Sequence, residues 1–500
     1  MFLFSPQNHR DFIIKKIRAY NEIIGITIVG FILRLYMAKL DPMLHDWDEK
    51  YHALVAKNMM QHPFKPMLYT HQYFSTDPFN WTYNHIWLHK QPLFLWQMAL
   101  SMKIFGVSEF TLRLPSVVMG TLMIILVYRV CILATGQKMA ALFAAILLCF
   151  NHYYLNLISG REGMDHNDIA FGFYVLASFW AFAEYVNKGS WKWILLTGFF
   201  AGCAILNKWL TGLIVFAPWG ILTLIDLVKS KKFGSILPLL AALLICCLVF
   251  LPWQCYILYT YPELAKYEYA FNAKHIWEVV EGHGGDIWRY LNLFPHYFGW
   301  YLNFLVPFGF IILFFQKDIT LKYKLLLSIA PVIVFCFFSF VVQTKIKAYF
   351  FMMAPICIIL MGLALNKITN YFGRLKYLMT FILIITCVYF SLNFKKINDY
   401  TNEVYYRQSK IYNTNIYKNL DAIIPANIKL VVNTNFTEHI DIMFYSKRLE
   451  AYHSAISEEE FKSVTKNNIP IAAFESREGH VLPDYIENYK NLHIIKVKLR

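Results

Sequence analysis

The sequence lacks any cysteine pattern that would mark a metal site or a disulfide framework, although it contains nine cysteines. All nine lie in or at the ends of apolar segments, where a free cysteine behaves as a small buried hydrophobe. A cleavable signal is also missing, because the first apolar run follows KKIR and continues without a small-residue cleavage site. We therefore expect the first apolar segment to stay as a membrane anchor and expect no disulfide-stapled fold.

Apolar residues dominate what is present. The chain is 57% hydrophobic and 18% aromatic, with a mean hydropathy of +0.41, which exceeds what one soluble core requires. Apolar stretches of about 17 to 25 residues, each long enough to cross a hydrocarbon core of roughly 30 Å as a helix, recur along the chain. They cover residues 21–39, 113–134, 167–187, 209–228, 235–258, 297–316, 325–342, 347–366 and 374–392, with shorter or more polar candidates at 92–106, 138–158 and 191–206. The sequence predicts a mainly α-helical, polytopic membrane protein of about 11 to 13 transmembrane helices.

Basic residues between the apolar segments predict the topology. Lys15, Lys16 and Arg18 precede the first helix, so the positive-inside rule places the N-terminus in the cytoplasm. Residue 92 is then outside and residue 228 inside, which requires an odd number of crossings. Six apolar segments lie between these two residues, so one of the six does not cross the membrane. The segment 138–160, interrupted by NHYYLN, is the candidate for a helix pair that enters from outside and returns. With this correction, the polar stretches gather on the outer face.

The last hundred or so residues differ in kind. KLVVNT, LEAYH, PIAAFES and LHIIKVK read as strands, interleaved with helical stretches such as ISEEEFKSVTK. We predict a transmembrane domain at 1–394, with outer loops at 41–91 and 261–296, and a small extracytoplasmic α/β domain at 395–500. The role of this second domain is open.

A cluster of carboxylates stands just after the first apolar segment. Asp46, Asp48 and Glu49 precede YHALVAKNMM, which has the pattern of a short amphipathic helix lying at the membrane interface. A helix N-terminus favours negative charge, but a cap explains only one of these side chains. A second polar stretch places Lys90 just before a proline-started helix. A cation there suits an anionic headgroup.

These stretches together resemble glycosyltransferase family 39 of the GT-C type, which includes the lipid A aminoarabinose transferase and the protein O-mannosyltransferases. The resemblance spans roughly residues 10–390 and depends on the order of short motifs. They are DE at Asp48 and Glu49, KQP at Lys90, FGVSEFTLRLPS at 105–116, R-x-x-x-D at Arg161 and Asp165, LNK ending at Lys208, EGHGG at 281–285 and TKIKAYFFMMAP at 344–355. Each motif alone is weak, and the order carries the resemblance.

The resemblance implies inverting transfer of a sugar from a polyprenyl phosphate to an acceptor on the outer face. Such chemistry needs a carboxylate to take the acceptor proton and cations to hold the phosphate leaving group. The matching positions make Asp48 the general base, with Glu49 beside it, and assign the donor phosphate to Lys90, Lys345, Tyr349 and Arg289. A helix-end anchor is the alternative for Lys345. Further cavity residues are Lys208, with Asp165 as its expected partner, together with Arg161 and Asp46.

Two departures from the family bear on substrate choice. Many relatives have an arginine where this chain has Tyr51, and an acidic residue where it has His89. The second departure leaves His89, His283 and Glu281 as a candidate divalent-metal set, since imidazole and carboxylate suit such ions. Ordinary polar lining is the alternative for these histidines, and no cofactor is required by the expected reaction.

We predict a glycosyltransferase of the bacterial inner membrane that uses a polyprenyl-phosphate sugar such as an undecaprenyl-linked one. Its acceptor would be a lipid A-type glycolipid or a protein hydroxyl, and no nucleic acid is expected as a partner. A transporter or flippase of lipid-linked sugars is the alternative, but carriers tend to show repeated halves, which this sequence lacks. A membrane scaffold is a third class, for which the outer charged cluster would be dispensable.

Overall fold

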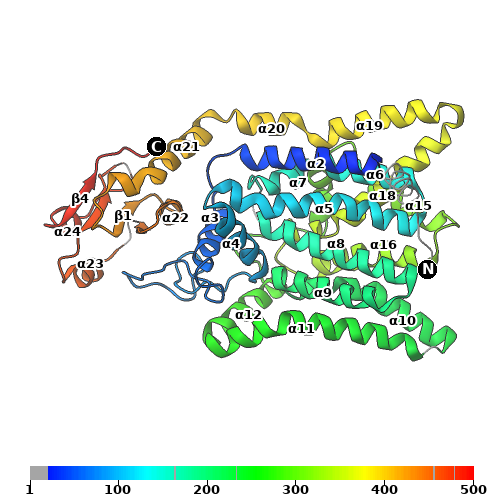
Figure 1. The fold of residues 1–500 in the computed structure, drawn as a ribbon, viewed down its shortest axis with the longest axis horizontal. Coiled ribbons are helices and arrows are strands. Elements are labelled where there is room, and N and C mark those ends of the chain that lie inside the picture. Colours follow the sequence, from blue (N-terminus) through cyan, green and yellow to red (C-terminus); the bar gives the residue numbers. More distant parts are fainter. Residues whose placement is uncertain (1–20, 163–164, 232, 454–455, 478) are drawn as a thin grey trace, which may run out of the picture.

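The computed structural model describes residues 21–162, 165–231, 233–453, 456–477 and 479–500. It consists of a long helical bundle with a small sheet beyond one end (Figure 1). We call the bundle end nearest the sheet the sheet end, and the other the far end. Lys15, Lys16 and Arg18, used above for topology, lie outside the described residues.

The bundle follows the apolar runs of the sequence. Its helices are α2 (Asn21–Lys39), α5 (Glu109–Thr135), α6 (Lys138–Phe150), α7 (His152–Ile158), α8 (Asp165–Lys188), α9 (Trp191–Lys208), α10 (Phe216–Ser230), α11 (Ile236–Thr260), α15 (Leu305–Phe315), α16 (Leu321–Cys336), α18 (Ala354–Tyr371) and α19 (Lys376–Leu392). Short turns η1 (Trp209–Val215), η2 (Phe233–Ser235), η3 (Phe337–Val341) and η4 (Gly373–Leu375) interrupt or join them. Within the described ranges, eight helices are long and apolar enough to span a membrane, or nine if the α6–α7 pair counts as one span. The chain is an integral membrane protein.

The sequence predicted more transmembrane helices than the eight or nine long ones, and part of the difference lies in one long stretch that contains two helices. The 40-residue stretch Trp191–Ser230 contains α9, η1 and α10. Trp209 has a φ of 60°, and a Cβ placed on Gly212 would lie 2.7 Å from the backbone nitrogen of Ile205. The chain therefore turns back at Trp209 rather than continuing straight. This turn lies at the sheet end.

The predicted returning helix pair at 138–160 is wrong. α6 and α7 meet at 45°, so they continue in one direction through the bundle (Figure 1). The segment that does not cross is α4 (Leu93–Phe105), whose 13 residues span only about 20 Å. Both of its flanks lie at the sheet end: Lys90 before it approaches Asp48, and Glu109 after it pairs with Lys418 of the C-terminal part.

Shorter helices join the long ones. They are α3 (Asp48–Met59), α12 (Pro262–Trp277), α13 (Arg289–Asn292), α14 (Phe294–Phe298) and α17 (Ala348–Phe351), and α3 packs against the C-terminal part. The structure buries α3 more completely than its interfacial pattern suggested, because the C-terminal part covers its polar side. Lys50 pairs with Asp441, and the Lys57 ammonium donates to the backbone carbonyls of Met443 and Ser446.

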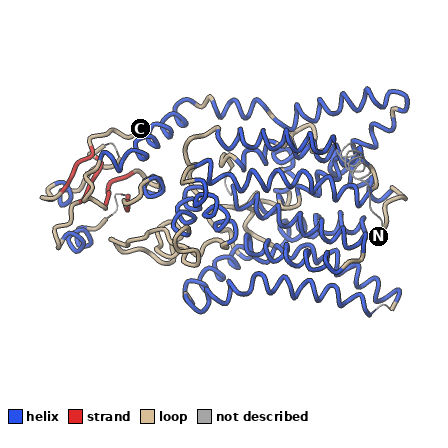
Figure 2. The backbone as a smooth tube through the Cα atoms, in the orientation of Figure 1, coloured by secondary structure: helices blue, strands red, loops and turns tan. Residues whose placement is uncertain are grey.

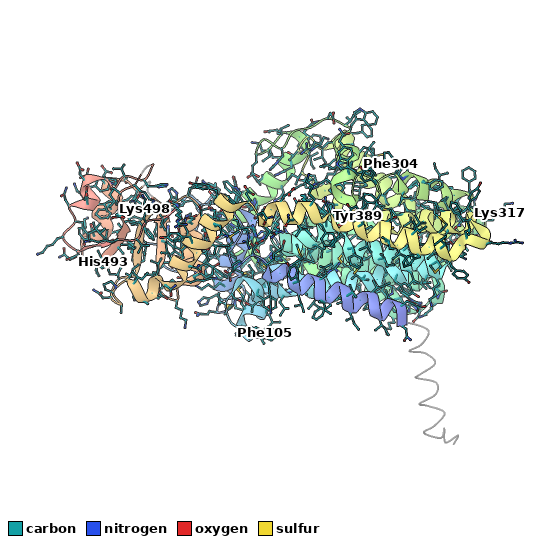
Figure 3. The ribbon with its side chains drawn as sticks, turned by 90° about the horizontal axis from the view of Figure 1, so that it is seen from above. Phe105, Phe304, Lys317, Tyr389, His493 and Lys498 are labelled. Carbon is teal, nitrogen blue, oxygen red and sulfur yellow. The ribbon has the colours of Figure 1, made fainter. Side chains whose placement is uncertain are left out.

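The C-terminal part begins with α20 (Phe394–Thr401) and α21 (Val404–Ile423) and contains the strands that the sequence predicted. They are β1 (Leu430–Thr434), β2 (Glu450–His453), β3 (Ile471–Phe474) and β4 (Leu492–Ile495), with α22 (Glu438–Tyr445), α23 (Glu458–Thr465) and α24 (Asp484–Glu487) between them. The four strands form a parallel sheet in the order β2-β1-β3-β4, and Figure 2 shows it apart from the helical bundle. In Figure 3, His493 and Lys498 of this part lie at the opposite end of the molecule from Lys317.

Candidate active site

Asp48 is the first residue of α3, where the helix N-terminus favours a negative charge. Its carboxylate lies 3.8 Å from the ammonium of Lys90 and 3.7 Å from His52 Nε2. Asp48 and Lys90 are each partly exposed, whereas the His52 side chain is buried. A carboxylate and a cation that are distant in the sequence therefore lie side by side.

Glu49, the other carboxylate predicted to be catalytic, points away from Asp48 into the core. Arg113 donates to both of its oxygens, at 2.7 and 2.9 Å, and the backbone N–H of His45 donates at 2.7 Å. A Cβ on Gly160, which has a φ of +79°, would lie 2.5 Å from its Oε2. Burial alone would raise the pKa of Glu49, but the Arg113 charge and hydrogen bonds outweigh it and lower that pKa. The geometry gives Glu49 a structural task, holding α3 in place.

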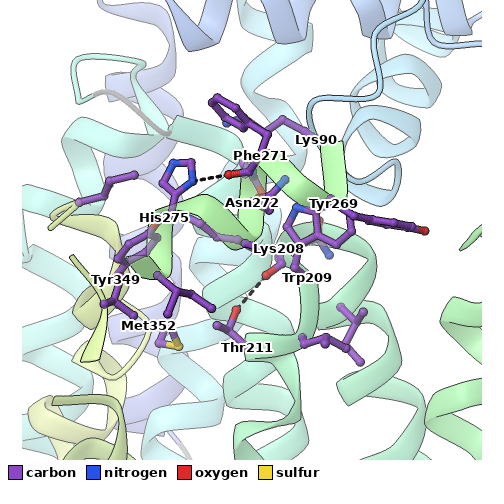
Figure 4. Close-up of a pocket in the computed structure, with 18 of the residues that line it drawn as sticks. Lys90, Lys208, Trp209, Thr211, Tyr269, Phe271, Asn272, His275, Tyr349 and Met352 are labelled. Carbon is purple, nitrogen blue, oxygen red and sulfur yellow. Dashed lines mark hydrogen bonds between the residues drawn. The ribbon is translucent and has the colours of Figure 1, made fainter. Parts of the chain in front are cut away.

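Lys90 also lines a cavity of about 680 Å³ at the sheet end (Figure 4). Its polar lining comes from the ends of α8 and α9, from α11 and α12 and from the loops, and includes His89, Lys90, Asn167, Asn207, Lys208, Gln254, Asn272, His275 and Glu281. Its apolar lining includes Ile205, Leu210, Phe250, Phe337, Phe338, Val342, Ile346 and Met352. A cavity lined by both kinds of residue suits a ligand that is itself amphipathic.

Lys208 lines the cavity beside Trp209 and pairs with Asp168 of α8 at 2.5 Å. The sequence had suggested Asp165 as the partner, and the side chain of Asp165 lies outside the described residues. Residues three apart share a helix face, so the sequence could not distinguish the two aspartates. Thr211 donates to the Lys208 carbonyl at 2.8 Å, which helps to fix the turn at the start of η1 (Figure 4).

Of the further predicted phosphate ligands, Tyr349 lines the cavity, whereas Lys345 and Arg289 do not. Tyr349 lines the cavity, with its ring stacked on Phe338 at 4.5 Å. The Lys345 ammonium instead donates to the backbone carbonyls of Phe338, Ser339 and Val342. It caps the end of η3, where unsatisfied carbonyls favour a cation. Arg289 is exposed and is not part of the cavity wall.

Arg161 and Asp46, predicted as cavity residues, belong to the junction with the C-terminal part. Arg161 donates to Asp41 at 2.7 Å and lies 4.3 Å from the ring centre of Tyr400. Asp46 pairs with Lys50 at 2.8 Å and with Lys410 at 3.1 Å. Neither side chain lines the 680 Å³ cavity.

The residues named as a candidate metal set do not converge. His89 Nδ1 lies 3.4 Å from Glu268, Glu281 accepts a hydrogen bond from Trp81 Nε1 at 2.9 Å, and His283 is exposed. Across the part of the chain that the structure describes, no three His, Cys, Asp or Glu side chains are arranged to hold a metal ion.

Glu268 is a buried residue next to the cavity that the sequence analysis missed, and it contacts the lining residue His89 at 3.4 Å. It lies at helical spacing from Asn272 and His275 of α12, which do line the cavity, and this polar stripe is the sequence signal that could have found it. Burial raises the pKa of Glu268 to about 7 and lowers that of His89 well below its ordinary value. Both groups therefore favour their neutral forms.

The raised pKa of Glu268 predicts a pH dependence of stability. The folded chain keeps a proton on Glu268 that the unfolded chain loses between its ordinary pKa of 4.5 and about 7. Stability from this group is therefore present below pH 4.5 and is lost as pH rises to about 7, by about 3 kcal/mol. We expect Glu268→Gln to reduce the fall in melting temperature across this range. The exposed neighbour Glu263→Gln is the control, and equal slopes in all three proteins would contradict the assignment.

Part of the chain is similar in sequence to known proteins. The model of the dolichyl-phosphate-mannose-protein mannosyltransferase family matches residues 89–256. The chain is 31% identical over 172 residues to the undecaprenyl phosphate-alpha-4-amino-4-deoxy-L-arabinose arabinosyl transferase of Pseudomonas aeruginosa, covering 32% of this chain and 28% of that protein. It is 26% identical over 185 residues to an uncharacterized protein of Aquifex aeolicus, covering 37% and 34%. The matches thus span about a third of the relatives' own length.

The fold extends the likeness over nearly the whole chain. Crystal structures of ArnT from Cupriavidus metallidurans superpose with a TM-score of 0.63 when bound to undecaprenyl phosphate, at 14% identity, covering 93% of this chain and 90% of ArnT. The oligosaccharyltransferase AglB of Archaeoglobus fulgidus gives a TM-score of 0.57 at 14% identity, covering 91% and 69%. The resemblance to GT-C glycosyltransferases related to ArnT and the O-mannosyltransferases is confirmed.

Proposed function

We propose that this GT-C chain is a membrane glycosyltransferase that moves a sugar from a polyprenyl-phosphate donor to an acceptor hydroxyl. The observation that carries the proposal is the 3.8 Å approach of Asp48 to Lys90, which lines the 680 Å³ cavity. A general base and a phosphate-binding cation are the two parts that this transfer needs side by side. The ArnT structure with undecaprenyl phosphate supports a polyprenyl phosphate as the donor's lipid part.

In the proposed reaction, an acceptor oxygen attacks the anomeric carbon of the donor while Asp48 takes the acceptor proton. The bond between that carbon and the phosphate oxygen breaks, and the phosphate leaves with the electron pair. Lys90 is placed to balance the charge on the leaving phosphate, and Lys208 and Tyr349 line the same cavity. The apolar lining residues would receive the first isoprene units of the lipid.

The proposed setting is the bacterial inner membrane, with the N-terminus cytoplasmic and the sheet end extracytoplasmic. The positive-inside rule supports this orientation, because the loop around Lys317 lies at the far end (Figure 3). The acceptor would then be a lipid A-type glycolipid or a protein hydroxyl on the outer face. Movement of a lipid-linked sugar across the bilayer is the competing function.

Lys90→Met tests the phosphate assignment. The substitution keeps the length of the side chain and removes its charge, so the affinity for undecaprenyl phosphate should fall by about 10- to 100-fold, as expected for a lost charge-assisted hydrogen bond. Binding is measured by titrating the purified protein in detergent. Lys65→Met, at an exposed position in the same outer loop, should bind as the wild type does. Equal affinity of Lys90→Met and wild type would remove Lys90 from the donor site.

A further inference from the structure

Trp47, directly before Asp48, adopts a backbone conformation that is costly for its residue type. Its φ is 67° and its side chain is 50% exposed. A bulky residue at positive φ is an outlier, and such strain is retained where surrounding structure or function requires it. This backbone conformation leaves a large aromatic side chain at the surface beside the proposed base.

Two further aromatic rings extend this surface. The ring of Phe436 lies 5.9 Å from that of Trp47, and the ring of Trp81 lies 6.5 Å away on a different loop. Phe436 is 51% exposed. We call Trp47, Trp81 and Phe436 the aromatic shelf. Three parts of the chain that are distant in sequence build it.

The aromatic shelf is continuous with the donor cavity. The Trp81 ring stacks on His89 at 4.9 Å and 8°, and its Nε1 donates to Glu281 at 2.9 Å. Both His89 and Glu281 line the cavity. A molecule on the shelf would therefore lie next to Asp48, which follows Trp47 in the chain, and next to two residues that line the cavity.

The third ring comes from the part of the sheet where α/β folds bind ligands. In the order β2-β1-β3-β4, the chain adds β2 on one side of β1 and then adds β3 on the other side, while all four strands stay parallel. Ligands of open parallel sheets bind outside the carboxyl ends of the strands at such a switch point. Phe436 follows the carboxyl end of β1. The next residue, Thr437, donates from Oγ1 to Asp46 Oδ1 at 3.3 Å, so this edge of the sheet faces the loop that directly precedes Asp48 and α3.

Polar side chains border the rings. His453, at the carboxyl end of β2, lies 5.7 Å from the Phe436 ring and is half-buried. Arg477, after β3, donates to Asn435 beside Phe436 at 2.7 Å. A sugar ring has one apolar C–H face and a rim of hydroxyls, which match flat aromatic rings with polar neighbours. A lipid tail has no hydroxyls to offer to this polar border.

We infer that the aromatic shelf is the acceptor site and that its occupant is a carbohydrate, stacked on the ring of Trp47 or Phe436 with a hydroxyl directed at Asp48. Because these two rings meet at 66°, a sugar face packs on one ring and the other ring borders it. This inference rests on the proposed function and deepens it by naming the acceptor class. It also gives the C-terminal sheet a task, since Phe436 is its contribution to the site.

The test measures binding of two oligosaccharides, maltohexaose and chitohexaose, to the full-length protein in detergent by saturation-transfer NMR. A serine-rich hexapeptide is the competing probe. We expect oligosaccharide signals with the wild type and with Asp48→Asn. With Phe436→Ala or Trp47→Ala, we expect the affinity for the oligosaccharide to fall about tenfold, as for the loss of a central aromatic anchor. The control is Phe79→Ala, since Phe79 is similarly exposed at 48% but lies outside the shelf.

The outcomes separate this inference from the proposed function. Oligosaccharide binding that is equal in the wild type, Phe436→Ala and Phe79→Ala overturns the shelf, as does binding of the peptide alone or of neither probe. If the wild type transfers labelled sugar but Phe436→Ala uses its acceptor equally well, the shelf fails and the transferase stands. Shelf-dependent oligosaccharide binding without any sugar transfer would instead overturn the proposed function.

Discussion

Sugar transfer by the Asp48→Asn variant is expected to be about 10²- to 10⁴-fold slower than that of the wild type, the usual contribution of a general base. Asparagine keeps the size of the side chain and its place at the start of α3, but it cannot take the acceptor proton. Affinity for undecaprenyl phosphate should change little, because Lys90 and the cavity wall remain. Initial transfer rates at saturating donor, together with donor binding, are the measurements.

The matched control for Asp48→Asn is Asp77→Asn, since Asp77 is an exposed aspartate in the loop that precedes Lys90. This variant should transfer at the wild-type rate. If Asp48→Asn also transfers at that rate, Asp48 is not the base. If it loses donor binding to the same extent as transfer, its role is to organise the donor site rather than to move a proton.

Glu49→Gln is expected to destabilise the protein by about 3 to 5 kcal/mol, because it leaves the buried Arg113 guanidinium without its counter-charge. The Glu49 and Arg113 side chains are both almost completely buried, so solvent cannot replace the lost partner. We expect a clear fall in melting temperature in detergent. Glu278→Gln, at an exposed position paired with Lys274, should leave the melting temperature unchanged.

The Glu49→Gln variant also shows whether Glu49 has a structural role or a catalytic role. Replacing Glu49 and Arg113 together by leucine should recover part of the stability lost in Glu49→Gln, because no unpaired charge is then buried. Transfer by folded Glu49→Gln protein, measured below its melting temperature, should stay well above that of Asp48→Asn. A Glu49→Gln protein that is as stable as the wild type but inactive would contradict the structural role and indicate that Glu49 is catalytic.

The sequence predicts most of the bundle because each long apolar run has only one way to satisfy its backbone in lipid. It misplaces the non-crossing segment because an interruption such as NHYYLN looks the same whether a helix bends or returns. The structure resolves this through α4, whose two flanks both lie at the sheet end, one beside Asp48 and the other beside Lys418. The strands were recognisable because short apolar runs alternated with helical stretches.

For the site, the sequence identifies residue types and their order but not their partners. Asp48 and Lys90 were predicted to act together and lie 3.8 Å apart. Lys345 was assigned to the phosphate, yet its ammonium is held by three backbone carbonyls at the end of η3. Glu49 follows Asp48 directly, and successive helical residues point in different directions. Such contacts depend on tertiary packing, which spacing alone does not encode.

Transfer of label by the wild-type chain is the most direct test. The purified protein is reconstituted with a radiolabelled polyprenyl-phosphate sugar and an outer-leaflet extract that supplies lipid, glycan and protein acceptors. We expect label to leave the donor and appear in a glycan-bearing acceptor, with release of unlabelled polyprenyl phosphate and no transfer by Asp48→Asn. Intact labelled donor moving across the bilayer, with no labelled acceptor formed, would show that the chain is a carrier and not a transferase.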